Sequence, residues 1–210
     1  MAEVKQNGIV VSPSTGSGDT ILQVKAETAN RGNRVTQTAT FEVEGSGVAE
    51  KKRFVANHLP AAEFIEFDNK NPAVEKGGGT VTLTGRSNSQ KITFSKGTGN
   101  IIGANLEAIK FTANGAEATS GISISGDPGA KAKYSFSLTL TAAENETIEA
   151  RTQQIIATAS GGQKATATLK QTAGDPFIEV VPTKVDVPQN GSAVQVTVDT
   201  NTTFTVTPKA

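Results

Sequence analysis

Apolar and polar residues alternate in short runs along most of this chain, the period expected of half-buried β-strands. The clearest run is YSFSLTL at 134–140, and FIEF at 64–67 has the same alternation. Gly, Pro, Asn or Asp, which favour turns, follow most runs within a few residues. No segment has the apolar spacing of a long helix. The pattern predicts an all-β protein built of β-sandwiches. The other expected strands are 8–11, 21–24, 35–43, 52–55, 80–84, 91–94, 121–125, 177–180 and 194–198.

Residues 95–120 have the least regular pattern. The run LEAIKF at 106–111 fits either a strand or a helical turn, and we favour a strand.

The chain also resembles itself. Residues 64–66 recur as 177–179, a shift of 113 (177 − 64), and the same shift takes 81–83 to 194–196. With one residue deleted, 92–94 recur as 204–206. The pairs found on the N-terminal side are Leu22 and Val24 with Leu138 and Leu140, Arg34 with Arg151, and Gly8–Ser12 with Gly121–Ser125. Such repetition predicts tandem copies of one unit.

The repeat divides the chain unevenly. We expect residues 1–67 to be the back half of a unit, 68–174 a complete unit, and 175–210 a front half. A fragment of two or three strands buries too little apolar surface to be stable alone. The N-terminal half of the same chain could cover it, a neighbouring copy could exchange strands with it, or it could pack as a short extension on the middle unit.

Composition narrows the possible partners. The 210 residues carry 20 basic and 20 acidic side chains, so no long-range field attracts nucleic acid or an anionic membrane. The basic cluster 50–53 is expected on the solvated face of a hairpin. Cysteine is absent, which excludes disulfides and thiolate metal sites. The N-terminal residues lack the apolar core of a signal peptide, so we expect a chain that is made in the cytosol and leaves it only inside an assembly.

No catalytic, cofactor-binding or metal-binding residues are predicted. His58 is the only histidine, lacks a cluster of catalytic partners in the sequence, and is expected at the surface or in a turn. Gly77–Gly79 could suggest a phosphate-binding loop, but no Lys-Ser/Thr follows, so we expect a turn.

Calcium and glycan are weaker alternatives. The carboxylates considered for calcium are Glu63, Glu66, Asp68, Asp186 and Asp199, whose spacing matches no known ligand pattern. A sugar site would need an exposed aromatic ring, yet there is no Trp and Tyr134 lies in a strand-like run. The triplets beginning at Asn145 and Asn201 match the N-glycosylation pattern, but we expect no modification in a chain that is not secreted.

One pattern resembles a known family. Arg151, Gly161-Gly162, Gln171, then Ile178–Val180, Gly191-Ser192 and Val194–Val198 follow the order found in BACON-type immunoglobulin-like domains of Bacteroidales and their phages. That family often continues with Asn-x-x-Trp, where this chain has Asn201-Thr202-Thr203-Phe204. The resemblance implies tandem immunoglobulin-like sandwiches.

The resemblance also implies a function. BACON domains accompany secreted glycan-processing enzymes, and related modules occur in virion proteins of tailed phages, including crAss-like phages. Since neither an enzyme nor a signal peptide is evident, we expect a non-enzymatic auxiliary (decoration) protein on a phage capsid. Its partners would be the major capsid protein and other virion proteins. The alternatives are a carbohydrate- or host-surface-binding module and a tail or baseplate protein.

Overall fold

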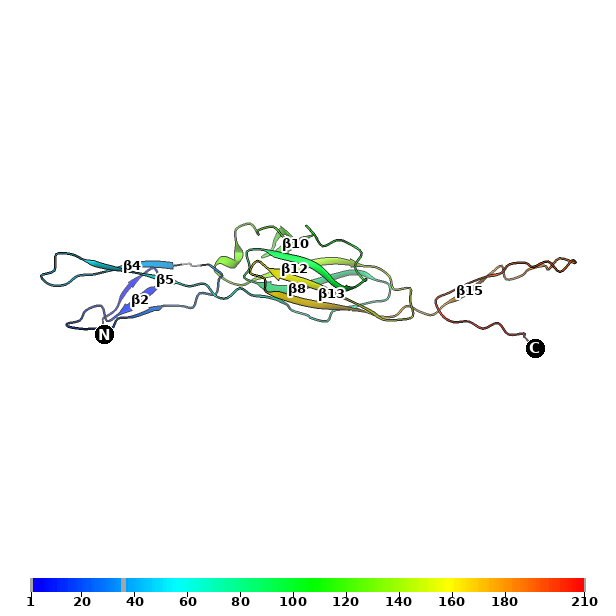
Figure 1. Ribbon diagram of the computed structural model, residues 1–210, viewed down its shortest axis with the longest axis horizontal. Coiled ribbons are helices and arrows are strands. Elements are labelled where there is room, and N and C mark those ends of the chain that lie inside the picture. Colours follow the sequence, from blue (N-terminus) through cyan, green and yellow to red (C-terminus); the bar gives the residue numbers. More distant parts are fainter. Residues whose placement is uncertain (1, 35–36, 210) are drawn as a thin grey trace.

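The computed structural model describes residues 2–34 and 37–209 and is nearly all β. Three parts follow one another along an elongated molecule (Figure 1). A small N-terminal part comes first, a large sandwich occupies the middle, and an extended C-terminal hairpin projects from the far side. The N- and C-terminal ends lie at opposite ends of the molecule.

Two sheets form the middle sandwich. The first has the strand order β11-β10-β12-β8-β6, and the second has the order β7-β14-β13-β9, in which β7 runs parallel to β14. The strands of the first sheet are β6 (Ile65–Phe67), β8 (Gly79–Ser87), β10 (Lys110–Ala113), β11 (Ala116–Thr119) and β12 (Tyr134–Ala142). Those of the second are β7 (Ala73–Val74), β9 (Ile92–Gly99), β13 (Arg151–Ala159) and β14 (Lys164–Gln171).

The middle sandwich encloses the main hydrophobic core. Alternate residues of the long strands point inward, and Leu138, Ile155 and Leu169 are 0% exposed. Phe94 makes edge-to-face contacts with Phe111 and Phe136, the geometry that aromatic pairs prefer. The predicted strands at 80–84, 91–94 and 134–140 therefore exist, with their apolar faces buried as the alternation indicated.

The N-terminal part has two small facing sheets. One contains β1 (Val4–Gln6), β2 (Ile9–Ser12) and β3 (Gln23–Ala26) in that order, and the other pairs β4 (Gln37–Val43) with β5 (Lys52–His58). Among the described residues, four buried apolar side chains gather between them. They are Ile9, Val11, Ala39 and Phe41.

The C-terminal part is one antiparallel pair, β15 (Ile178–Val181) with β16 (Thr197–Thr200). Every described residue from 175 to 209 is exposed or half-buried, so this segment has no core of its own. It projects away from the middle sandwich (Figure 1), which is not the arrangement of an extension packed on that sandwich.

Three sequence-based expectations need correction. Residues 121–125 are not a strand: positive φ angles at Gly121 and Gly126 turn the chain, Ile122 is 61% exposed, and the segment makes only an isolated bridge from Ser123. The proposed pairing of Gly8–Ser12 with this segment is therefore wrong.

The run at 106–111 is a strand only from Lys110, because residues 106–109 form a turn in which Ala108 has φ +55°. The boundary after residue 67 is also misplaced. It separates β6 from the sheet of β8, to which β6 is hydrogen-bonded. Residues 35–36, the start of one expected strand, lie outside the described part.

Candidate functional site

A buried asparagine holds the first strand of the middle sandwich. Asn88 is 0% exposed; its Oδ1 accepts a hydrogen bond from the Phe64 N–H at 2.7 Å, and its Nδ2 donates to the Ala62 carbonyl at 3.0 Å. The neighbouring Ser87 hydroxyl donates to the Phe64 carbonyl at 2.8 Å. These bonds fix the chain where it enters β6.

The same bonds recur where the chain enters β15. Asn201 Oδ1 accepts from the Phe177 N–H at 3.0 Å, and Asn201 Nδ2 donates to the Asp175 carbonyl at 2.9 Å. The Thr200 hydroxyl donates to the Phe177 carbonyl at 2.6 Å. Each atom lies 113 residues after its counterpart (201 − 88, 177 − 64). The repeat thus extends from sequence to hydrogen bonding.

Strand register repeats as well. In the middle sandwich Ile65 lies opposite Ser87, and in the hairpin Ile178 lies opposite Thr200, again shifted by 113 at both residues (178 − 65, 200 − 87). By this shift, β8 corresponds to residues 192–200. Of these, 197–200 form β16. The first part of β8 pairs with β12 alone, and the described hairpin contains no strand equivalent to β12, so residues 192–196 have no partner strand.

The C-terminal segment therefore presents partly or largely exposed apolar side chains at positions that are buried in the middle sandwich. Val194 and Val196 are 40% and 44% exposed, whereas their counterparts Val81 and Leu83 are 8% and 2% exposed. The contrast is larger for Phe204 and Val206, which are 51% and 83% exposed where Ile92 and Phe94 are 0% and 1% exposed. These four side chains have the pattern of core residues without a core.

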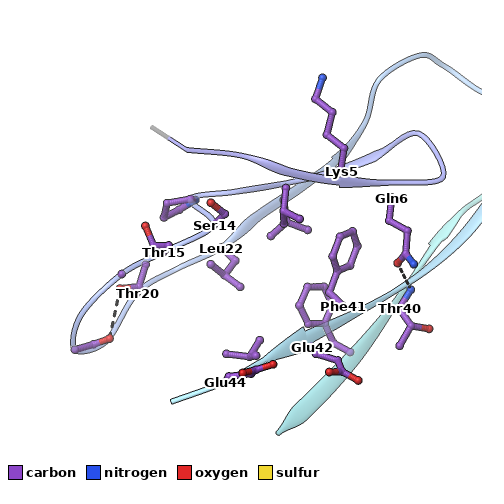
Figure 2. Close-up of a pocket in the computed structure, with 17 residues that line it drawn as sticks. Lys5, Gln6, Ser14, Thr15, Thr20, Leu22, Thr40, Phe41, Glu42 and Glu44 are labelled. Carbon is purple, nitrogen blue, oxygen red and sulfur yellow. Dashed lines mark hydrogen bonds between the residues drawn. The ribbon is translucent and has the colours of Figure 1, made fainter. Parts of the chain in front are cut away.

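The N-terminal part has the complementary deficit. A gap of about 720 Å³ opens between its two sheets and is lined by Val11, Leu22, Phe41, Val43, Phe54 and more polar neighbours. Figure 2 shows Leu22 and Phe41 pointing into this gap and Lys5 pointing away from it. Among the described strands, β3 pairs only with β2 and β4 pairs only with β5, so each has one unpaired edge. Residues of β4 line the gap, and so does Leu22, which directly precedes β3.

Those edges correspond to paired edges in the middle sandwich. A shift of 116 takes Leu22 and Val24 to Leu138 and Leu140 of β12 (138 − 22). Although Arg34 and Arg151 differ by 117, the same shift of 116 places the buried Ala39 and Phe41 of β4 on the buried Ile155 and Ala157 of β13 (155 − 39, 157 − 41). In the middle sandwich β8 pairs with β12 and β9 pairs with β13. The N-terminal part thus lacks strands in the two places that front-half strands occupy in the complete unit.

His58 has a structural place. It ends β5 rather than lying in a turn, its Nε2 accepts the Asn30 N–H at 3.0 Å, and its Nδ1 lies 3.0 Å from Gln37 Oε1. Both ring nitrogens are engaged, so the imidazole ties the β4–β5 pair to the preceding loop.

The carboxylates considered for calcium do not converge. Glu66 and Asp68 both approach Arg86, at 3.7 and 3.6 Å, while Asp186 lies 3.8 Å from Lys184. Asp199 lies opposite another acid, Glu179, across the hairpin. Within residues 2–34 and 37–209, no group of three or more potential metal ligands is found.

Glu63 has a different role, at the junction with the middle sandwich. Its carboxylate accepts hydrogen bonds from the Ser160 hydroxyl, at 2.6 Å, and from the Gly161 N–H. Partial burial opposes ionisation, but hydrogen bonds from Ser160, Ser89 and Gly161 outweigh it and leave the pKa of Glu63 below its ordinary value. The ionised side chain clamps the β13–β14 turn.

The remaining candidates are also structural. Gly78 donates its N–H to Glu75 within the turn before β8, as expected for Gly77–Gly79. Tyr134 is 4% exposed and donates to the Ser89 carbonyl at 2.7 Å, and burial raises its pKa to about 12. Its ring is therefore part of the core and offers no sugar platform. Asn145 is 1% exposed and donates to the carbonyls of Glu149 and Thr172.

The basic cluster at 50–53 lies on the exposed β4–β5 hairpin, as predicted. Lys51 approaches Glu42 and Glu44, Lys52 lies 2.7 Å from Glu50, and Arg53 lies 2.6 Å from Glu42. These pairs neutralise the cluster locally, so it presents no phosphate-binding patch.

Sequence reasoning missed the roles of Asn88 and Asn201. The signal was present, because both asparagines follow a Ser or Thr at matching places in the repeat. Amide side chains do not titrate and match no catalytic or metal-binding motif, yet these two position the paired strands.

No helix in the described part of the chain is long and apolar enough to span a membrane.

Comparisons with known proteins give little information about this chain. No known protein family matches the sequence, and neither does any curated protein. One similar solved structure is an NMR structure of a protein from Bacteroides thetaiotaomicron, 14% identical, covering 54% of this chain and 91% of that one with a TM-score of 0.28. A likeness this weak carries no argument about fold family or function.

Proposed function

We propose that this chain is a non-enzymatic structural protein that acts through protein–protein contacts, as an auxiliary (decoration) protein on the capsid of a tailed bacteriophage. Its modules would be immunoglobulin-like sandwiches of the BACON type. The virion and capsid assignment rests on the resemblance of the repeat pattern to that family.

One observation carries the structural role. Exposed apolar side chains gather near both ends of the molecule, in the segment 192–206 and in or beside β3 and β4, where strands have unpaired edges. Unpaired edges bind extended polypeptide by strand addition, whereas small ligands bind in enclosed concave pockets. The gap in Figure 2 is an open space between two sheets, and apolar and polar side chains are mixed in its lining.

The proposed mechanism is surface covering. An elongated molecule with unpaired strand edges at both ends can lie across neighbouring capsomers. Each contact buries additional surface area, which stabilises the shell against separation of its capsomers. Balanced charge suits this role, because the particle surface is then held by local contacts rather than by a long-range field.

Purified particles provide the test. We expect the chain to sediment with the major capsid protein at a fixed ratio, and electron microscopy to show its sandwiches on the outer face of the head. Particles without the chain should release their genome at lower temperature than wild type.

Three outcomes would contradict the proposal. Absence of the chain from particles would refute a virion role, and density confined to the tail would favour the tail or baseplate alternative. Specific binding of the free protein on a glycan array would favour the carbohydrate-binding alternative.

A further inference from the structure

We propose that the C-terminal segment of one copy completes the N-terminal half-sandwich of a second copy by strand addition. Residues 192–206 of the donor copy would pair with β3 and β4 of the acceptor copy and insert their apolar side chains into the gap of Figure 2. This inference deepens the proposed function and rests on it in one respect: both require that the chain binds other protein chains.

The middle sandwich supplies the register of the first pairing. There Leu83 of β8 lies opposite Leu138 of β12, and Thr82 lies opposite Thr139. Applying the shifts of 113 and 116, Val196 of the donor lies opposite Leu22 of the acceptor (83 + 113, 138 − 116). By the same arithmetic Gln195 lies opposite Gln23. The donor strand would then extend back to residue 192 and β3 would begin before Leu22, matching the longer β8 and β12.

The second pairing follows in the same way. Phe94 of β9 lies opposite Ala157 of β13, so Val206 of the donor is placed opposite Phe41 of β4 (94 + 112, 157 − 116). Phe204 is likewise placed opposite Val43. Phe94 and Ala157 of the middle unit correspond to Val206 and Phe41 of the proposed junction. Both pairs combine one large and one smaller side chain at this layer of the core.

Burial supports a protein segment of this composition as the occupant. The acceptor side chains Leu22 and Val24 are 37% and 46% exposed, although their counterparts in β12 are 0% and 3% exposed. The donor segment and the acceptor half-sandwich thus expose side chains that face each other in the core of the complete middle unit. Each part would supply the strands that the other lacks.

The geometry favours a second copy over closure within one chain. The N-terminal part and the C-terminal hairpin lie at opposite ends of the molecule, separated by the middle sandwich (Figure 1). A contact that joins one end of a copy to the other end of the next is heterologous, and such contacts build strings or rings. We therefore expect elongated head-to-tail oligomers whose junctions resemble the middle sandwich.

Disulfide trapping tests the register directly, because the natural chain contains no cysteine. The variants Gln23→Cys and Gln195→Cys each place one thiol at an exposed position outside the core. Mixed at equal concentration and oxidised mildly, the two full-length variants should give a crossed disulfide dimer in high yield. Each variant alone, and Gln23→Cys mixed with Gln189→Cys at the exposed far tip, should give at least tenfold less.

Light scattering supplies an independent measurement. The 210-residue chain should show concentration-dependent mass above one copy, and Val196→Asp should abolish it because a charge would enter the completed core. The middle sandwich of this variant should keep its melting temperature, since Val196 lies outside that core. A chain that stays monomeric at high concentration and gives no 23–195 disulfide would overturn the inference.

The outcome is separable from that of the proposed function. A chain that forms the 23–195 disulfide in solution but is absent from particles would refute the capsid role and retain strand exchange. The opposite result is a chain that is found on capsids but whose Gln23→Cys and Gln195→Cys variants do not crosslink, either on the particle or in solution. That result would support the capsid role and refute strand exchange.

Discussion

The middle sandwich and the two terminal segments contain equivalent strands in different states. Leu83 and Leu138 pack in the centre of the middle core, whereas their counterparts Val196 and Leu22 are 44% and 37% exposed at opposite ends of the molecule. Alternation of apolar residues is similar in both places. The comparison teaches that the alternation fixes which face of a strand can be buried, and that burial itself depends on whether both halves of the unit are present.

The difference has an energetic side. Fully burying one Val, Leu or Phe side chain contributes about 1.5–3 kcal/mol, so the complete unit gains this many times over. The β15–β16 hairpin gains almost none of it, and an isolated two-stranded hairpin is marginally stable in water. Side-chain hydrogen bonds of Asn201 join the hairpin to the chain before β15 and to the Glu146 carbonyl of the middle sandwich.

The largest expected effect comes from equivalent leucines. Leu138→Ala should lower the free energy of unfolding of the middle sandwich by about 3 kcal/mol, because it opens a cavity at a 0% exposed site. Leu22→Ala should change it by less than about 0.5 kcal/mol, as expected for an exposed site. Chemical denaturation at low protein concentration measures both values.

The same two variants also test whether the N-terminal part differs from the middle sandwich in having an open core. Leu22→Ala should weaken self-association although it leaves the middle sandwich intact, and sedimentation at high concentration would show this. If Leu22→Ala destabilised the isolated monomer as much as Leu138→Ala does, the N-terminal half would already have a closed core.

A smaller contrast is expected at the two asparagines. Asn88→Ala leaves the buried Phe64 N–H without its partner, which should cost about 2 kcal/mol of middle-sandwich stability. Asn201→Ala removes the equivalent bonds and a further one, from Asn201 Nδ2 to the Glu146 carbonyl at 2.7 Å. Because this site is more accessible, water can replace the bonds, and the variant should cost the middle sandwich nothing measurable. Hydrogen exchange should instead show faster exchange at the Phe177 amide. Equal losses of stability in the two variants would contradict the difference in burial.

Glu63 should make the middle sandwich sensitive to acid. Its pKa in the folded state lies below the ordinary value of 4.5, so its stabilising effect is present above that pH and is lost as the pH falls through the folded-state pKa. Glu63→Gln should cost about 1 kcal/mol at pH 7, since hydrogen bonds to a charged acceptor are lost. Denaturation at pH 7 and near pH 3 should show the gap between wild type and variant closing in acid. A gap that persisted would assign the effect to shape rather than charge.

Much of the fold was predictable because strand alternation and repeats are local signals. The runs at 80–84 and 134–140 form strands with the expected buried faces, and the shift of 113 found in 64–66 reappears in strand register. The failures occur where backbone conformation dominates over pattern. Residues 121–125 alternate cleanly, yet positive φ angles at the flanking glycines make them a turn.

The candidate site was less predictable. The sequence repeat predicts a half-unit at each end, but the position of the two terminal parts at opposite ends of the molecule depends on how the middle sandwich orients its neighbours. The contribution of Asn88 was hard to predict for another reason: its amide bonds two backbone groups 24 and 26 residues away, and the only sequence signal is that Ser87-Asn88 recurs as Thr200-Asn201 in the repeat.

The smallest predicted effect concerns charge across the hairpin. In the middle sandwich Glu66 lies opposite Arg86, and the equivalent pair in the hairpin is Glu179 opposite Asp199, two acids that repel. Asp199→Arg should therefore stabilise the hairpin by about 0.5 kcal/mol, the scale of an exposed ion pair.

The proposed register also places residue 199 of the donor opposite Asp19 of the acceptor, since Arg86 and Ser135 are opposite in the middle sandwich (86 + 113, 135 − 116). Asp199→Arg should thus tighten self-association a few-fold, and added salt should remove the gain because both partners are exposed. Asp199→Asn is the matched control, which relieves repulsion without adding attraction and should give a smaller gain. Hydrogen exchange of the β15 amides and the dissociation constant from sedimentation would measure the two effects separately. A gain in hairpin protection without tighter association would place Asp19 elsewhere and contradict the register while leaving the hairpin itself correctly described.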